Sequence, residues 1–266
     1  MSNLRAVTLI TGASAGIGVE LARVFARHGH ALALVARRAD RLNLLADEIA
    51  ASGAPRPIVI ATDLALANAA QAIRDLLTAA GCEPQYVVNN AGFGLVGAAS
   101  SLDGAEQLSM IDLNMRTLTD LSLAFIDSMQ RHRGGLRNVG SVAGFLPGPG
   151  SAVYYATKAY VLSFTEALHS ELKPRGIKVS VLCPGPVPTE FAARAGVVGD
   201  VAPGMLTQTA ATVAQAGFDG LMRNTRTIVP GLGNKLVLLA VRFLPRSMLL
   251  RMVNARQSRR RAAQKA

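Results

Sequence analysis

Short apolar segments alternate with segments of helical periodicity along most of this chain, and no other feature restricts its fold so strongly. Strands are predicted at residues 5–11, 31–36, 57–61, 86–89, 136–140, 177–182 and 226–229. Helices are predicted between them, at residues 16–27, 40–51, 65–80, 102–131, 153–173 and 209–222. Strands that alternate with helices form a parallel sheet with helices on both faces. We therefore predict an α/β fold with a single, doubly wound parallel sheet.

Length and composition agree with one large domain in a reducing compartment. The chain has 266 residues, of which 50% are hydrophobic, so it can bury a sizeable core. Its apolar runs are too short to span a membrane, and residues 1–10 lack the pattern of a secretory signal. Its two cysteines cannot form a disulfide framework, and its four histidines are scattered. These observations predict a cytoplasmic protein without a metal site.

Positive charge is concentrated at the C-terminal end of the chain. The formal net charge is +11, but residues 1–219 hold all 17 acidic residues and only 17 of the 28 Lys and Arg residues. The body is therefore formally neutral, which argues against nucleic acid as a partner. We divide the chain into a body, residues 1–230, and a basic tail, residues 231–266, which is predicted to form a helical extension. Residues 184–210 lack a clean period and are predicted to be a mobile insertion, in which residues 186–210 form a lid that orders over bound substrate.

The first predicted strand runs into a glycine-rich loop and then directly into a helix. The loop reads TGASAGIG, at residues 11–18. Gly12 permits a tight turn, Gly16 allows the backbone to approach a pyrophosphate, and Gly18 allows helix and strand to pack closely. Free N–H groups at the helix start favour an anion there. We interpret the loop as a dinucleotide site rather than as a purely structural turn.

The residues after the second predicted strand indicate which dinucleotide binds. A site for NAD places Asp or Glu there to bind the ribose 2′-hydroxyl, whereas this chain has Arg37 and Arg38. Two guanidinium groups suit the 2′-phosphate of NADP(H), which we therefore prefer to NAD(H). The alternative is a pair of solvated surface arginines. Asp40 lies beyond the expected acidic position and is predicted to cap the next helix.

Several separated motifs occur in an order that resembles the short-chain dehydrogenase/reductase family. TGASAGIG is followed by NNAG at residues 89–92, by Ser141 and by the pair Tyr154-x-x-x-Lys158. The resemblance covers about residues 5–230 and leaves out the basic tail. It implies one Rossmann-type domain and an NAD(P)-dependent enzyme (EC 1.1.1.-) that transfers hydride between the nicotinamide and a carbonyl or alcohol. A homodimer or homotetramer is expected.

Matched residue by residue, the resemblance implies a catalytic set and a cofactor site. The catalytic set is Asn114, Ser141, Tyr154 and Lys158. Asp63 and Leu64 are expected beside adenine, and residues 184–189 beside the nicotinamide. The whole cofactor set is Gly12, Ser14, Ala15, Gly16, Ile17, Gly18, Arg37, Arg38, Asp63, Leu64, Asn90, Ala91, Gly92, Tyr154, Lys158, Pro184, Gly185, Val187 and Thr189.

These residue types suit the reduction of a carbonyl group. The carbonyl oxygen gains negative charge in the transition state, so a proton donor must be aimed at it. Tyr154 can supply the proton, and Lys158 shares its helix face, where its charge is predicted to bring the phenol toward the working pH. The resemblance implies that Lys158 also holds the nicotinamide ribose, that Ser141 bonds the substrate oxygen and that Asn114 holds a water in a proton relay. Tyr155 breaks the spacing and is assigned to the core or an interface.

The predicted border of the carbonyl site is apolar and uncharged, which favours a lipophilic ketone, aldehyde or secondary alcohol. Ordinary loop packing also explains the residues in this border. They are Phe93, Gly94, Phe145, Leu146, Val187, Phe191, Met205 and Leu206. A 3-oxoacyl or steroid-type reductase at a membrane surface is an alternative function. A non-catalytic NAD(P)-binding scaffold or regulator is another, but the complete catalytic set argues against it.

The basic tail has two short amphipathic segments, at residues 234–244 and 246–256. Leu236, Leu239, Ala240 and Phe243 form one apolar stripe, and residues 249, 252 and 253 form a second. The tail can pack on the body or on a neighbouring subunit. Alternatively, it lies on the inner, anionic membrane surface as a peripheral contact. Nucleic acid is a poor third candidate, because no aromatic residue lies within the basic run.

Overall fold

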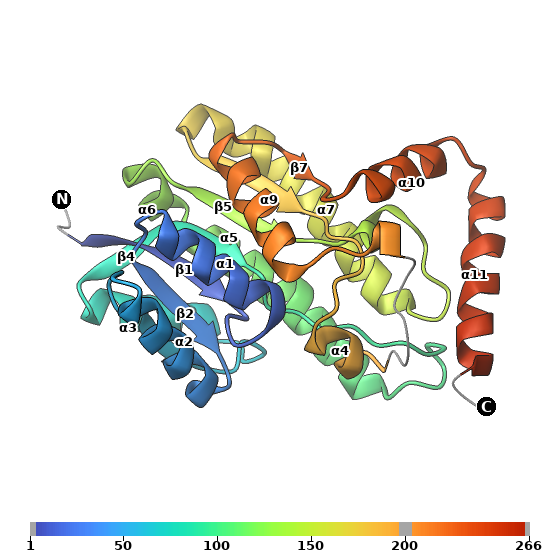
Figure 1. The fold of residues 1–266 in the computed structure, drawn as a ribbon, viewed down its shortest axis with the longest axis horizontal. Coiled ribbons are helices and arrows are strands. Elements are labelled where there is room, and N and C mark those ends of the chain that lie inside the picture. Colours follow the sequence, from blue (N-terminus) through green and yellow to red (C-terminus); the bar gives the residue numbers. More distant parts are fainter. Residues whose placement is uncertain (1–3, 197–203, 264–266) are drawn as a thin grey trace.

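The computed structural model of the protein describes residues 4–196 and 204–263, with side chains up to residue 255. Seven parallel strands in these residues form one sheet in the order 3-2-1-4-5-6-7 (Figure 1). The strands are β1 (Arg5–Thr11), β2 (Leu32–Ala36), β3 (Ile58–Ala61), β4 (Cys82–Asn89), β5 (Gly135–Val139), β6 (Lys178–Leu182) and β7 (Thr227–Ile228). The predicted doubly wound α/β fold is confirmed.

Helices cover both faces of the sheet and enclose two layers of core. On one face lie α1 (Gly16–Arg27), α2 (Ala39–Ala51) and α9 (Ala210–Met222). On the other lie α3 (Ala69–Ala79), α5 (Leu118–Ala124), α6 (Ile126–Arg131) and α7 (Ala152–Leu172). The central strands are apolar on both faces, because each face is covered.

Two predicted boundaries are wrong for identifiable reasons. The single helix predicted at residues 102–131 is instead α4 (Gly104–Ile111), the π-helical turn η1 (Asp112–Thr117), α5 and α6. A hydrophobic period does not show where the backbone changes from α to π geometry. Strand β4 begins at Cys82 rather than at residue 86, because residues 82–84 pair with β1 across a register shift. Pro84 and Glu83 hid this part of the strand from the sequence analysis.

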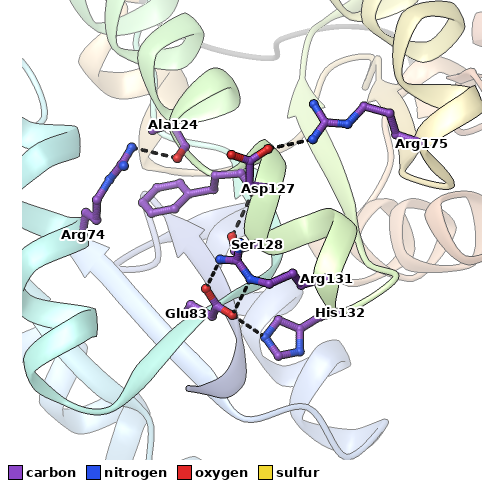
Figure 2. A network of polar contacts seen from close by, with 9 residues as sticks. Arg74, Glu83, Ala124, Asp127, Ser128, Arg131, His132 and Arg175 are labelled. Carbon is purple, nitrogen blue, oxygen red and sulfur yellow. Dashed lines mark hydrogen bonds and ion pairs between the residues drawn. The ribbon is translucent and has the colours of Figure 1, made fainter. Parts of the chain in front are cut away.

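An ionic network ties α6 to the amino end of β4 (Figure 2). The carboxylate of Glu83 is buried, pairs with the Arg131 guanidinium and accepts a hydrogen bond from His132 at 2.9 Å. On the other side of α6, Arg175 pairs with Asp127 at 2.6 Å. The network lies at the amino ends of the parallel strands. It therefore holds α6 against the end of the sheet that is opposite to the carboxyl ends of the strands.

The sheet interior holds one buried cation without a partner. Arg137 on β5 is fully buried, and none of its guanidinium nitrogens has a hydrogen-bond partner among the described residues. Ser180 lies opposite it on β6, and its hydroxyl is also buried and unpaired. Gly217 of α9 lies above the guanidinium, where a Cβ atom would be 3.3 Å from one of its nitrogens. Burial lowers the pKa of Arg137 to about 9.

The tail forms two helices beyond β7, α10 (Leu232–Arg242) and α11 (Arg246–Ala263). In Figure 1, α10 leads away from the sheet and α11 stands at the far side of the molecule from α2 and α3. The predicted stripe on α10 faces solvent, with Leu236 65% and Phe243 78% exposed. This stripe therefore does not pack on the body, whereas Leu249 of the second stripe is buried. No helix among the described residues is long and apolar enough to cross a membrane.

Candidate active site

A cavity of about 760 Å³ opens at the carboxyl ends of the central strands, where open parallel sheets bind their ligands. Most residues that the sequence assigned to cofactor or catalysis line it. They are Gly12, Ser14, Ala15, Gly16, Ile17, Arg37, Arg38, Asp63, Leu64, Asn90, Ala91, Gly92, Ser141, Tyr154, Lys158, Pro184, Gly185, Val187 and Thr189. Gly18 and Asn114 lie behind this wall. The structure therefore brings the predicted set together around one space.

The glycine-rich loop turns from β1 into α1 with its backbone against the cavity. Gly12 and Gly16 have φ values of +65° and +55°, a region that favours glycine. A Cβ atom at Gly16 would lie 2.9 Å from the Thr189 methyl group, and one at Gly18 would lie 2.1 Å from the Gly12 carbonyl oxygen. Gly18 thus permits close packing of α1, while Gly16 leaves a cradle at the start of the helix. This geometry suits a pyrophosphate.

Hydrogen bonds hold this loop against the end of β4. Asn90 Nδ2 donates to the backbone oxygens of Thr11 at 3.0 Å and of Gly12 at 3.2 Å. The Thr11 hydroxyl accepts from the backbone N–H groups of Asn90 and Ala91, both at 3.0 Å. The sequence analysis gave Thr11 no role, although it opens the glycine-rich motif. It is a positioning residue for the cavity floor.

Arg37 and Arg38 follow β2 at the edge of the cavity. The Arg38 guanidinium donates to the Ser14 hydroxyl at 3.2 Å and pairs with Glu190 at 2.8 Å. The Glu190 carboxylate also lies 3.6 Å from Arg41. Arg37 is exposed and has no ion-pair partner among the described residues. Glu190 was missed because it is far from these arginines in sequence.

The backbone of α2 starts differently from the prediction. Arg38 occupies the N-cap position, and no side chain caps this end. Asp40 lies inside the first turn instead of capping it, so its prediction is wrong. Its charge still lies near the positive end of the helix dipole, which explains why an acid is favourable there.

Three of the four predicted catalytic side chains meet at one point of the wall. Tyr154 and Lys158 are one turn apart on α7, with the Lys158 ammonium 5.9 Å from the centre of the Tyr154 ring. Ser141 follows β5, and its hydroxyl lies near enough to the Tyr154 phenol to lower the pKa of that phenol. It also accepts from the backbone N–H of Ala143 at 3.1 Å. Lys158 donates to the Val139 backbone oxygen at 2.9 Å, which directs its ammonium toward the sheet.

Asn114, the fourth, stands directly behind this group in the π-helical turn η1. Its Nδ2 donates to the Phe93 backbone oxygen at 2.9 Å and to the Thr157 hydroxyl at 3.2 Å. A Cβ atom at Gly92 would lie 2.9 Å from Asn114 Oδ1 and 3.7 Å from Lys158 Nζ. The missing side chain at Gly92 therefore leaves a space that both polar groups border. The π turn inserts an extra residue per turn and aims Asn114 inward.

Burial controls the acid–base properties of the site. It raises the pKa of Tyr154 to about 12, an effect that the Ser141 hydroxyl partly offsets. It lowers the pKa of Lys158 to about 8. That Lys158 brings the phenol toward neutral pH stays a prediction. The phenol stays protonated, which is the form that can donate a proton to a carbonyl oxygen.

The substrate side of the cavity is mostly apolar but contains one cation. Arg194 of α8 (Glu190–Arg194) lines it, with its guanidinium 4.4 Å from the centre of the Phe93 ring. The prediction of an uncharged wall is wrong at this residue. Of the predicted border residues, Gly94, Phe145 and Met205 do not line the cavity, whereas five others do. These are Phe93, Leu146, Val187, Phe191 and Leu206.

The tail contributes to the same wall, which the sequence analysis did not foresee. Val237, Leu238 and Val253 line the cavity beside Tyr155, which is therefore not simply a core residue. Asn234 anchors α10, because its buried Nδ2 donates to the Leu206 backbone oxygen at 3.1 Å. Both sides of α10 carry apolar residues, so the sequence does not show which side faces the cavity and which faces solvent.

The residues present fit a nicotinamide dinucleotide. The glycine cradle, Tyr154 and Lys158 all line this one cavity. Gly92 and Gly185 line the wall without a side chain that would narrow it. Among the described residues there is no cluster of His, Cys, Asp and Glu that could hold a metal ion.

Comparison with known proteins agrees with this geometry. Residues 6–196 match the short chain dehydrogenase family. Sulfoacetaldehyde reductase 2 of Chromohalobacter salexigens is 38% identical over 188 residues, which are 70% of this chain and 74% of that protein. A short-chain dehydrogenase from Sphingobium yanoikuyae, solved with NADPH, is 32% identical with a TM-score of 0.78 and covers 90% of this chain and 94% of its own.

A second solved structure is similar to a comparable extent. The bulky-bulky ketone specific alcohol dehydrogenase from Comamonas testosteroni is 29% identical with a TM-score of 0.73, over 91% of this chain and 100% of its own. A short chain dehydrogenase/reductase from Burkholderia phymatum, 25% identical with a TM-score of 0.76, was solved in complex with NAD. The chain belongs to the short-chain dehydrogenase family. It is an oxidoreductase that uses a nicotinamide cofactor and acts on a small-molecule carbonyl or alcohol, as the resemblance implied.

Proposed function

We propose that this enzyme uses NADPH to reduce a lipophilic ketone or aldehyde. The observation that carries the proposal is the meeting of Tyr154, Ser141 and Lys158 at the apolar end of one cavity that also holds the glycine cradle. When bound, the reduced nicotinamide supplies a hydride and leaves as the oxidised form. Every other part of the reaction falls to side chains of this chain.

Each catalytic residue has a distinct part in the proposal. Tyr154 donates its phenolic proton to the carbonyl oxygen as the carbonyl carbon gains the hydride, so the product is an alcohol. Ser141 binds the same oxygen and stabilises the charge that develops on it. Lys158 restores the proton, because its pKa of about 8 lets it exchange protons with water near neutral pH. Asn114 positions Phe93 and Thr157 behind it and borders the space through which water reaches Lys158.

The preference for NADP(H) is supported by the charges at the end of β2. Arg37 is exposed and has no ion pair among the described residues, so it is available to a 2′-phosphate. Arg38 is already fixed by Ser14 and Glu190, which holds it beside the cavity. No acidic residue follows Arg37 and Arg38 at the position that binds a ribose 2′-hydroxyl in NAD sites. We infer that Arg37 and Arg38 together recognise the phosphate.

A small anionic aldehyde is a second candidate substrate. Arg194 lies in the wall with no ion pair among the described residues, and it could bind a negative group of the substrate. The similar protein from Chromohalobacter is named for such a substrate. The lipophilic candidate is preferred because the rest of the substrate wall is apolar, and the similar Comamonas enzyme is named for bulky ketones.

We also propose that the two parts of the chain have different roles. Residues 1–230 form the cofactor-binding and catalytic part, and residues 231–266 extend it. The outward stripe of α10 supports a peripheral contact with an anionic membrane surface, or with another copy in a homodimer or homotetramer. A cytoplasmic enzyme that approaches the membrane in this way could be a 3-oxoacyl or steroid-type reductase. A non-catalytic scaffold is less well supported, because it needs no aligned proton donor.

A screen of carbonyl compounds tests the proposed activity. The full chain is mixed with NADPH, and its absorbance is followed with apolar ketones, apolar aldehydes and short anionic aldehydes. We expect the fastest oxidation with an apolar compound, and none with the Tyr154→Phe variant. Faster turnover of the short anionic aldehydes would favour the second candidate. Absence of turnover with every compound and with both cofactors would support the scaffold instead.

A further inference from the structure

A second groove beneath the tail adjoins the catalytic cavity. This groove has a volume of about 1280 Å³ and lies between α7, the turn η2 (Val142–Phe145), the following loop and the two tail helices. Leu146, Tyr155 and Leu238 line both spaces, so the two spaces lie next to each other on either side of these side chains. In Figure 1, α10 and α11 are well separated from the central sheet. A ligand longer than the catalytic cavity would have to pass these three side chains to enter the groove.

The walls of the groove are apolar. Phe145 and Pro147 line it from the body, and Leu239, Leu249 and Leu250 line it from the tail. Leu239 is 56% exposed and Phe145 is 36% exposed, although both are large apolar side chains. Apolar side chains gathered around a concave space are typical of a binding site for an apolar group.

The groove has a rim of three cations. Lys235 and Arg242 of α10 and Arg246 of α11 are its charged lining residues, and no acidic residue lines it. None of the three side chains forms an ion pair with a described residue. Lys235 and Arg242 are two helical turns apart, about 10 Å along the axis. Leu238 lies between Lys235 and Arg242 on α10, so the cations flank the apolar wall of the groove. The groove is thus complementary to a ligand that has both a hydrocarbon chain and a negative group.

We propose that the substrate is a long-chain aldehyde or ketone with a carboxylate or similar anion at the far end of its chain. Its carbonyl lies at Tyr154 and Ser141, its chain passes between Leu146 and Leu238, and its anion lies among the cationic rim. This inference rests on the proposed function, whose substrate class it narrows. In this proposal the body holds the catalytic residues, and the tail determines which chain length and which terminal charge the enzyme prefers.

A homologous series of oxo acids and their methyl esters tests this assignment. The full chain is assayed with NADPH, and kcat/KM is measured from short to long unbranched chains. Each methylene that enters the groove is expected to raise kcat/KM by about threefold to fourfold, the factor for about 0.8 kcal/mol. The increase should stop once the chain fills the groove. The acid should exceed its ester by about tenfold or more at full length, with a smaller ratio for short chains.

A double charge reversal and a matched control separate the loss of anion binding from a loss of folding. The double variant Arg242→Glu, Arg246→Glu is expected to remove the preference for long acids over their esters. Arg251→Glu is the matched control, because Arg251 lies on α11 but lines neither cavity. It should keep the preference. Thermal melting of both variants shows whether the tail still folds.

The outcomes separate this inference from the proposed function. Reduction of short ketones with no dependence on chain length overturns the inference and leaves the proposed function intact. An acid preference equal for short and long chains also overturns it, since that pattern places the anion near Arg194. If the double variant abolishes sedimentation with anionic vesicles but keeps the acid-to-ester ratio, the rim faces a membrane and the inference is wrong. Absence of any carbonyl reduction contradicts the proposed function itself.

Discussion

The body and the tail of this protein differ in how they place apolar and charged side chains. In the body, apolar side chains are interior and most charged groups at the sheet edge are paired, as Glu83 and Arg131 show. In the tail, Leu236 and Phe243 face solvent, and the cations of the rim have no partners among the described residues. The body is held by contacts with itself. The tail has exposed apolar and cationic side chains at which another molecule can bind, whether substrate, membrane or second copy.

The largest expected effect confines the chemistry to the body. Tyr154→Phe removes the transferable proton while it keeps the ring, so kcat should fall by at least about 10²–10⁴-fold, the usual contribution of a positioned acid. Cofactor affinity should change little. Stopped-flow NADPH oxidation and a fluorescence titration measure the two quantities. Tyr155→Phe is the matched control, and near-normal turnover by Tyr154→Phe would remove Tyr154 from the mechanism.

The next effect concerns the preference for NADPH over NADH, which we also attribute to residues of the body. Replacement of both Arg37 and Arg38 by Ala should weaken NADPH binding by a few kcal/mol, since each charge-assisted hydrogen bond contributes about 1.5–3 kcal/mol. NADH lacks the phosphate and should lose far less. Isothermal titration with both cofactors checks this. Equal losses would mean that the arginines contact something other than the 2′-phosphate.

The next prediction concerns Arg137, the buried charged group of the body that lacks a hydrogen-bond partner among the described residues. Arg137→Leu removes a fully buried guanidinium with no partner among the described residues, so the free energy of unfolding should rise by about 1–4 kcal/mol. Urea unfolding of both proteins measures the difference. Arg175→Leu is the control on the surface, where the expected change is below about 1 kcal/mol. A clear loss of stability in Arg137→Leu would show that this group has an anionic or water partner.

A smaller effect is expected where the body pairs its charges. Hydrogen bonds from Arg131 and then His132 lower the pKa of Glu83. Because the folded pKa is depressed, the pair stabilises the protein above the ordinary value of 4.5, and this stability is lost as the pH falls below it. Glu83→Gln should cost about 1 kcal/mol at neutral pH and flatten the acid dependence of urea unfolding. Asp47→Asn, at an exposed pair, should change the dependence much less.

The smallest effect is expected when the tail is shortened and only cofactor binding is measured. Removal of residues 246–266 should change NADPH affinity by less than about twofold, because the glycine-rich loop, Arg37 and Arg38, which are proposed to hold the dinucleotide, all lie in the body. The same variant should lose salt-sensitive sedimentation with anionic vesicles, since each arginine near such a surface contributes about 1 kcal/mol. A lower melting temperature or a smaller oligomer, with no vesicle binding by the full chain, would instead assign the tail to packing or assembly.

The same contrast explains what the sequence could predict. The order of strands and helices and the residues of the glycine-rich loop follow from local periodicity and from motifs, which report on the body. Glu190, Arg194 and Val253 lie far in sequence from the groups they join, so no spacing reveals them. The π turn at Asn114 leaves the apolar pattern nearly unchanged. The direction of the stripe on α10 depends on how the tail is placed, which periodicity does not specify.

The position of the groove on one side of the catalytic cavity has a consequence for the chirality of the product. A ketone with one long and one short substituent can direct its long arm past Leu146 and Leu238 in only one way, while the short arm stays beside Phe93 and Phe191. The carbonyl then presents the same prochiral face to the nicotinamide side of the cavity in every turnover. Such a substrate should give one enantiomer of its alcohol, and the enantiomeric excess should decline as the two arms become equal in length.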